Sequence, residues 1–170
     1  WVSAFDVESF IIDIRDYIVQ KYPLPDLRNQ LKANPAINSL CKDEDGIFWF
    51  SQDRYGLCIY DSRKEKLKHY SQCQGTRNLP FGDVTNIARS YNHNWIWATS
   101  YGPTVFGLSQ QNMEMKEDVR IELGNVTNNP GLITSLFEDP QNNLWIGTTT
   151  GLFVYRIMSA TLESIPEVSG

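Results

Sequence analysis

The sequence predicts an all-β protein built from repeated four-stranded antiparallel sheets, and three observations support this. Tryptophans recur 48 residues apart, at Trp1, Trp49, Trp97 and Trp145. Short segments rich in β-branched and aromatic residues alternate with Gly, Asn and Pro, as is typical of strands and turns. Strands such as "IFWF" (47–50) are apolar on both faces, so each sheet needs a partner above and below.

Radial stacking of twisted sheets supplies both partners, and this is the arrangement of a β-propeller. We therefore expect a β-propeller fragment of about three and a half four-stranded blades with a 48-residue repeat. Residues 1–34 are expected to form a partial blade (strands B to D) and an irregular connection. Residues 35–80, 81–130 and 131–166 are expected to form one blade each, all within one propeller domain that is part of a larger ring.

Strand A, the innermost strand of each blade, is predicted at "INSL" (37–40), "VTNI" (84–87) and "ITSL" (133–136). Strand B carries the tryptophan, and its fixed place in the repeat predicts that the tryptophan belongs to the core. Three residues before it stand Gly46, Asn94 and Asn142, which are residue types that readily adopt the left-handed conformation of a tight turn.

Strand C is predicted to begin at Gly56, Gly102 and Gly151, in "GLCIY", "GPTVF" and "GLFVY". Strand D is less regular, as in "KLKHYS" (66–71) and "ATLESI" (160–165). Because "WVSA" at the start aligns with strand B, we expect its blade to lack strand A and the chain to be a piece of a longer protein.

Composition and charge exclude several classes of partner. The net charge of −5 and the pI near 5.0 argue against nucleic acid and anionic membrane surfaces, because binding phosphate requires a basic surface. No apolar run approaches the roughly 20 residues of a membrane span, so we expect no direct membrane insertion by this segment.

No catalytic, metal or cofactor site is expected, so the fragment is not predicted to be an enzyme. The two histidines, His69 and His93, have no companions at metal or triad spacing. The three cysteines, Cys41, Cys58 and Cys73, lack metal spacing as well. A disulfide bond between Cys58 and Cys73 across strands C and D is geometrically possible, but buried free thiols are favoured.

The last repeat, "ITSLFEDPQNNLWIGTTTGLFVY", resembles the two-component regulator propeller repeat, whose pattern reads roughly I-x-S-L-x-x-D-x-x-G-x-L-W-I-G-T-x-x-G-L. Asp43 and Asp139 match its aspartate, Gly46 and Asn142 its glycine. In the middle repeat Tyr91 stands where the aspartate is expected.

This resemblance implies the extracytoplasmic, periplasmic ligand-sensing region of a Bacteroides-type hybrid two-component system sensor. It implies a glycan fragment as the ligand and a histidine kinase elsewhere in the parent chain. The alternative is a non-enzymatic propeller scaffold of the secretion-system type, which binds protein or cell-surface polysaccharide. Other expected partners are further propeller blades of the same protein or a second copy of the chain.

A ligand is expected at the loops between strands B and C and between strands D and A, because these loops gather on one face of a propeller. Tyrosine and arginine side chains there are suited to stacking on sugar rings, and Asp and Thr to hydrogen bonds with hydroxyls. The alternative is that these are ordinary exposed loop residues. The candidate ligand-binding residues are Asp53, Arg54, Tyr55, Tyr101, Thr149 and Thr150.

Overall fold

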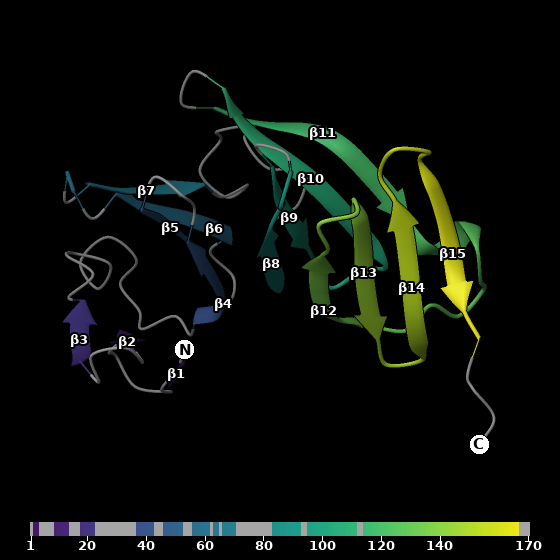
Figure 1. The fold of residues 1–170 in the computed structure, drawn as a ribbon, viewed down its shortest axis with the longest axis horizontal. Coiled ribbons are helices and arrows are strands. Elements are labelled where there is room, and N and C mark those ends of the chain that lie inside the picture. Colours follow the sequence, from purple (N-terminus) through teal and green to yellow (C-terminus); the bar gives the residue numbers. More distant parts are fainter. Residues whose placement is uncertain are drawn as a thin grey trace.

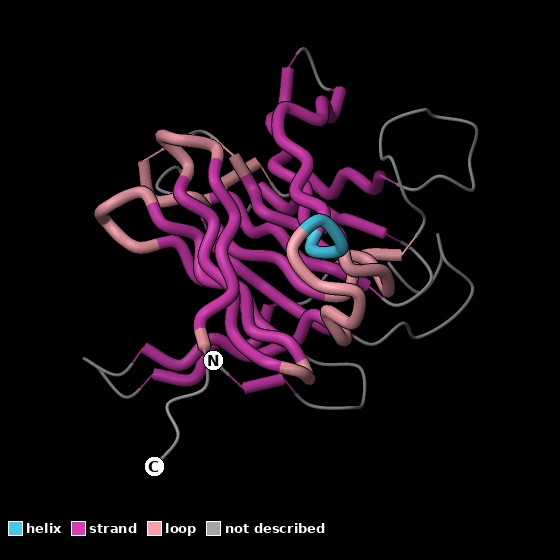
Figure 2. The backbone as a smooth tube through the Cα atoms, turned by 90° about the vertical axis from the view of Figure 1, so that its right-hand side faces the viewer, coloured by secondary structure: helices cyan, strands magenta, loops and turns pink. Residues whose placement is uncertain are grey.

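A computed structural model describes residues 2–3, 9–13, 18–22, 37–42, 46–52, 56–61, 63–64, 66–70, 83–92, 95–111 and 114–166. Its strands form one three-stranded and three four-stranded antiparallel sheets, which follow one another in sequence order (Figure 1). Apart from a short 3-10 turn, η2 (Leu123–Asn125), the secondary structure of the described part is strand (Figure 2). The predicted all-β propeller fragment is confirmed.

We name the sheets by their order along the chain, and in each the strands pair consecutively. The partial blade contains β1 (Val2–Ser3), β2 (Ser9–Asp13) and β3 (Ile18–Tyr22). The first blade contains β4 (Ile37–Lys42), β5 (Ile47–Gln52), β6 (Gly56–Asp61) and β7 (Lys66–Tyr70). The second contains β8 (Asn86–Arg89), β9 (Ile96–Thr99), β10 (Thr104–Gln111) and β11 (Glu114–Glu122). The third contains β12 (Ile133–Glu138), β13 (Asn143–Thr148), β14 (Gly151–Arg156) and β15 (Thr161–Ile165).

Apolar side chains pack between neighbouring blades, as the two-sided apolar strands predict. One core cluster joins the first and second blades and includes Trp49, Leu57, Ile59, Ile87, Phe106 and Leu108. Another joins the second and third blades and includes Trp97, Val105, Leu144, Ile146 and Phe153. Because each cluster draws on two sheets, burying apolar surface holds the blades together as well as each blade internally.

The repeated tryptophans are core residues in the first two blades and partly exposed in the third. Trp97 is fully buried, with 0% of its surface accessible, and Trp49 is buried as well. Trp145 is half-buried, and its neighbour across the sheet, Phe137, is 62% exposed. The face of the third blade that carries these two side chains therefore lacks the cover that a following blade gives to Trp49 and Trp97.

Polar side chains link the inner strands of neighbouring blades. Ser39 Oγ donates to the carbonyl oxygen of Ile87 and accepts from its N–H, both at 3.1 Å. Asn86 Nδ2 donates to the carbonyl oxygen of Ile133 at 3.2 Å. Ser39 and Asn86 hold the same repeat position, opposite the small residue of strand B, and Ser135 holds it in the third blade. Ser135 is exposed, since no blade follows it in the structure.

The third strand of the second blade begins at Thr104, two residues later than predicted. Pro103 has no N–H to give to a ladder, and residues 100–103 form the connection from β9 instead. The shift places Gly107 opposite Trp97, where the other blades have Ile59 and Val154.

The turn after β8 also differs from its prediction, because Ser90 rather than Tyr91 takes the place of the aspartate. Ser90 N–H donates to the carbonyl oxygen of Trp95 at 3.1 Å, as Asp139 N–H does to that of Asn143 at 2.9 Å. The turn of the second blade is one residue longer, and Tyr91 is an additional, exposed residue in it.

The turn between β12 and β13 is organised by the carboxylate of Asp139. Its Oδ1 accepts from the N–H groups of Gln141 and Asn143, each at 2.9 Å, and its Oδ2 accepts from Trp145 Nε1 at 2.8 Å. Asn142 has the predicted left-handed backbone, with φ of 62°, as does Gly46 with 82°. Burial works to raise the pKa of Asp139, but the hydrogen bonds from Trp145, Asn143 and Gln141 together lower it below its ordinary value.

Asp139→Asn is expected to destabilise the protein at neutral pH and to have less effect in acid. A carboxyl group whose folded-state pKa is lowered contributes stability above its unfolded-state pKa, near 3.8, and loses that contribution as the pH falls through the folded-state value. The free energy of unfolding of both proteins, measured in urea from pH 7 to pH 2.5, should therefore converge below about pH 4. A gap that stays constant over this range would contradict the assigned role of Asp139.

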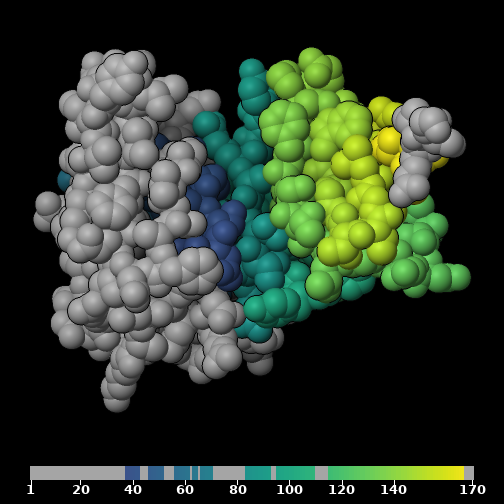
Figure 3. All heavy atoms as spheres, turned by 90° about the horizontal axis from the view of Figure 1, so that it is seen from below, coloured from purple at the N-terminus to yellow at the C-terminus, as the bar shows by residue number. Residues whose placement is uncertain are grey.

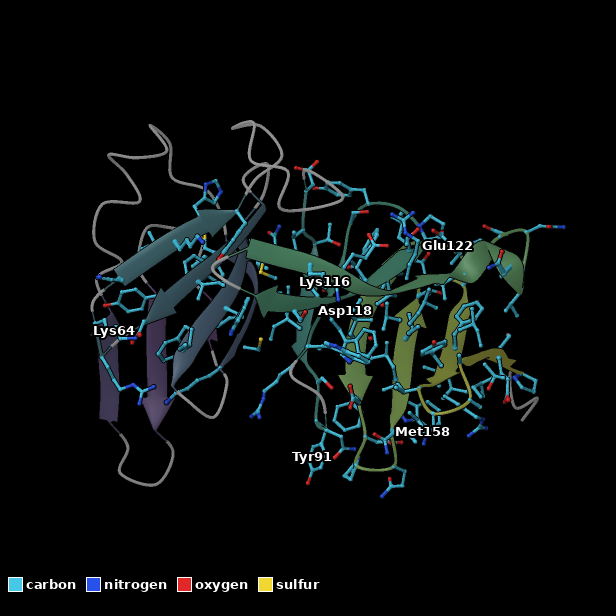
Figure 4. All side chains as sticks on the ribbon, turned by 90° about the horizontal axis from the view of Figure 1, so that it is seen from above. Lys64, Tyr91, Lys116, Asp118, Glu122 and Met158 are labelled. Atoms are coloured by element: carbon cyan, nitrogen blue, oxygen red, sulfur yellow. The ribbon has the colours of Figure 1, made fainter. Side chains whose placement is uncertain are left out.

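The ribbon formed by β10 and β11 is longer than the other hairpins and extends across the top of the second blade toward the first (Figure 1). Met115 on its inner side belongs to the cluster that contains Trp49. Its outer edge is charged, with ion pairs between Lys116 and Asp118 (2.7 Å) and between Arg120 and Glu117 (2.9 Å); Lys116 and Asp118 are labelled in Figure 4. Exposed charges on an edge strand hinder pairing with strands of other molecules.

Candidate functional site

The loops at one end of the second and third blades form a continuous surface, which we call the loop rim and define as residues 100–103, 123–132 and 149–150. The first and last ranges connect strands B and C of the two blades, and residues 123–132 run from β11 to β12. Antiparallel pairing brings all three to the same end of the sheets, at the bottom of Figure 1; Figure 3 shows this end from below. The structure thus brings together the predicted loops of these two blades.

Tyr101 projects from the rim and is 60% exposed. The loop that carries it is tied to the scaffold at both ends. Thr85 Oγ1 donates to the carbonyl oxygen of Ser100 at 3.2 Å, and Leu123 N–H donates to that of Pro103 at 3.0 Å. An exposed aromatic ring on an anchored loop offers a stacking surface at a small cost in conformational entropy.

Thr149 and Thr150 are exposed on the rim, and their hydroxyl groups hold the neighbouring loop. Thr149 Oγ1 accepts from Leu132 N–H at 3.0 Å, and Thr150 Oγ1 donates to the carbonyl oxygen of Asn129 at 3.2 Å. Gly131 makes this contact possible, because a Cβ atom there would lie 2.6 Å from Thr149 Oγ1 and its φ is +72°. Both threonines therefore shape the rim, and their remaining hydrogen-bonding capacity faces solvent.

Asp53, Arg54 and Tyr55, the candidates in the first blade, lie outside the described residues. Their part in a site stays a prediction.

Two exposed apolar side chains on the rim, Val126 and Leu132, are absent from the predicted set. A signal for Leu132 exists in the sequence, since it follows "NNPG" (128–131), in which the Pro-Gly pair marks a turn just before β12. Their exposure depends on the path of residues 123–132 over the end of the blades.

The loop rim is uncharged, because its sequence contains no Asp, Glu, Lys, Arg or His. It offers one tyrosine, two apolar side chains, and the polar groups of Ser, Thr and Asn. Such a surface suits a neutral ligand that has both hydroxyl groups and apolar faces, and it lacks the cations that bind phosphate or carboxylate groups.

The described residues contain no group of three or more His, Cys, Asp or Glu side chains that could hold a metal ion. Cys58 is buried in β6, and burial raises the pKa of its thiol. Among the helices of the described part, none is long and apolar enough to cross a membrane.

The fold defines a β-propeller segment whose loops form an uncharged surface at one end of the blades. Residues 129–150 match the family model described as two component regulator propeller, which confirms the resemblance drawn from the last repeat. No curated protein sequence matches the chain.

Solved propellers share this fold at low sequence identity. The β-propeller domain of Cps50 (Swd1) from Myceliophteria thermophila gives a TM-score of 0.72 at 11% identity, over 96% of this chain and 54% of that one. Two extracellular domains ascribed to hybrid two component systems of B. thetaiotaomicron give TM-scores of 0.64 and 0.65 at 16% and 19% identity. They cover 88% and 99% of this chain, which spans only 21% of each of those domains. The chain is thus a propeller segment similar to the extracellular regions of such sensors.

Proposed function

We propose that the chain is the ligand-sensing propeller segment of a hybrid two-component system sensor, located in the periplasm, and that it has no enzymatic activity of its own. The match of residues 129–150 to the regulator propeller family supports this proposal. The similarity in fold to extracellular domains ascribed to hybrid two component systems supports it as well.

The proposed ligand is a fragment of a neutral glycan, and the uncharged loop rim is the observation that carries this choice. Sugar rings present apolar faces that stack on aromatic side chains and hydroxyl groups that exchange hydrogen bonds with Ser, Thr and Asn. Tyr101 supplies the stacking surface. Residues 123–132 contact its loop through Leu123, and contact Thr149 and Thr150 through Leu132 and Asn129. Acidic glycans would find no cationic partner on the described rim.

Tyr101→Ala is expected to weaken binding of a neutral oligosaccharide by about fivefold, since stacking on one aromatic ring contributes on the order of 1 kcal/mol. Titration calorimetry with a panel of neutral and acidic oligosaccharides measures this. The melting temperature should stay within about 1 °C of the wild type, because Tyr101 is mostly exposed.

Tyr91→Ala is the matched control for this test. Tyr91 is equally exposed but lies in the turn after β8, at the other end of the strands (labelled in Figure 4). Tyr91→Ala should leave the affinity for the oligosaccharide unchanged. Equal affinities for wild type and Tyr101→Ala, or a preference for acidic oligosaccharides, would refute the proposed site.

We further propose that the open face of the third blade binds another blade of the same protein, or a second copy of the chain when the segment is alone. Ser135, Phe137 and Trp145 lie on this face at the positions where the first two blades contact the next. The large exposed surface of Phe137 favours association, because burying it removes apolar area from water.

Light scattering on the 170-residue chain should therefore give a mass above 19.5 kDa that increases with concentration. Phe137→Ser should shift the chain toward the monomer. Met158→Ser, which changes an exposed side chain on the turn between β14 and β15, should not. A stable wild-type monomer at all concentrations would contradict this proposal while leaving the glycan site untouched.

A further inference from the structure

Glu138, the last residue of β12, is a buried carboxylate whose hydrogen-bond partners in the structure lie in the second blade. It is 4% exposed. Its Oε2 accepts from Trp97 Nε1 at 2.5 Å, and its Oε1 accepts from the N–H groups of Tyr91 at 3.1 Å and Asn92 at 3.3 Å. One side chain of the third blade thus binds both the turn and the tryptophan of the second.

This set of contacts repeats what Asp139 does within its own blade. There the carboxylate binds two turn N–H groups with one oxygen and the indole N–H of Trp145 with the other. The second blade has Ser90 at the corresponding place and so lacks a carboxylate of its own. Two backbone donors and a buried indole would then need another acceptor, because unpaired buried donors are costly.

We infer that Glu138 supplies in trans the carboxylate that the second blade lacks, and that this contact orders the first turn of the second blade against the third blade. The side chains at the same strand position in the other blades support this. Lys42, the last residue of β4, pairs with Phe48, and Arg89, the last residue of β8, pairs with Ile96. Glu138 pairs with Leu144 in the same way, so the three residues hold the same strand position. Of the second and third blades, only the third has an acid at this position, and only the third follows a blade whose sequence lacks the aspartate between strands A and B; the first blade has Asp43 there in the sequence.

A second contact joins the same two turns. Asn92 Nδ2 donates to Asn142 Oδ1 at 2.9 Å and to the carbonyl oxygen of Pro140 at 3.3 Å. Separating the second and third blades would therefore remove the acceptors of three donors in this turn, the N–H groups of Tyr91 and Asn92 and Asn92 Nδ2.

The test moves the carboxylate between blades in the 170-residue chain. Glu138→Ser should lower the melting temperature by about 5–10 °C, which is the range expected when a charged acceptor is taken from one buried and two partly buried donors. Glu138→Gln keeps the size of the side chain and should also lower the melting temperature, but by less. Glu163→Gln, which removes a charge from the exposed ion pair with Arg156, is the matched control and should change little.

Ser90→Asp provides the discriminating measurement. In the Glu138→Ser background it returns a carboxylate to the second blade's own turn and should recover most of the lost melting temperature. In the wild-type background it places two carboxylates at one set of donors and should lower the melting temperature.

Hydrogen exchange gives a local readout that a general loss of stability would not reproduce. The amide protons of Tyr91 and Asn92 should exchange at least about tenfold faster in Glu138→Gln, while those within the third blade keep their rates. The inference is overturned if Glu138→Gln matches the wild type in both measurements, or if Ser90→Asp has the same effect in both backgrounds. If Glu138→Ser fails to fold, Glu138→Gln alone carries the test.

Discussion

Trp97→Ala is expected to lower the free energy of unfolding by about 3–5 kcal/mol, the range for truncating a large aromatic side chain in a packed core. Trp97 is fully buried in the cluster between the second and third blades. Its removal leaves a cavity between two sheets and takes a hydrogen bond from Glu138. Urea unfolding followed by circular dichroism measures the change.

Trp145→Ala is the matched comparison, because it makes the same change at the same repeat position. Trp145 is half-buried, with an uncovered face, so we expect its truncation to cost clearly less than that of Trp97. Equal losses for both variants would show that the third blade's face is covered in solution. A loss below about 1 kcal/mol for Trp97→Ala would contradict the packing described between the blades.

Gly107→Val is expected to destabilise the protein by about 1–3 kcal/mol, although it makes the second blade more like the others. Ile59 and Val154 occupy this position in the first and third blades. In the second blade a Cβ atom at residue 107 would lie 3.0 Å from both the Trp97 ring and the Val119 Cβ atom. The added side chain must displace one of them, and both contribute to the core.

Thermal unfolding compared with Gly124→Val tests this prediction. Gly124 lies in η2, and a Cβ atom there would meet no other atom within 4 Å. Gly124→Val should therefore be nearly neutral. If Gly107→Val raised the melting temperature, the repeat pattern would be a better guide to this position than the contacts around it.

The repeat predicted most of the fold because each blade places the same residue types at the same points of its sheet. Gly46 and Asn142 adopt left-handed backbone for reasons local to their turns. Trp49 and Trp97 are buried because the following blade repeats the same pattern of apolar strands and covers them. The errors lie where the second blade departs from the common length. Pro103 delays its third strand, and Tyr91 adds a residue to its first turn.

The candidate site was predicted less completely, because its geometry depends on contacts between separate loops. The order of the strands predicts which loops lie at the same end of the blades, and it predicts that Tyr101 is exposed there. The roles of Thr149 and Thr150 do not, since they depend on where residues 129–132 run. The acceptor for Trp97 could not be found from the repeat either, because it comes from a residue 41 positions away in another blade.

Tandem repeats are gained and lost by duplication and deletion, and the carboxylate of Glu138 restricts which of these events this protein tolerates. The third blade carries Asp139 and completes its own turn, so a copy of it brings everything that its turn requires. The second blade lacks a carboxylate for its own turn. If a copy of it came before a blade without an acid at the end of strand A, the turn of that copy would have no acceptor. We expect the second blade to be duplicated only together with the third blade, and the third blade not to be deleted while the second is kept.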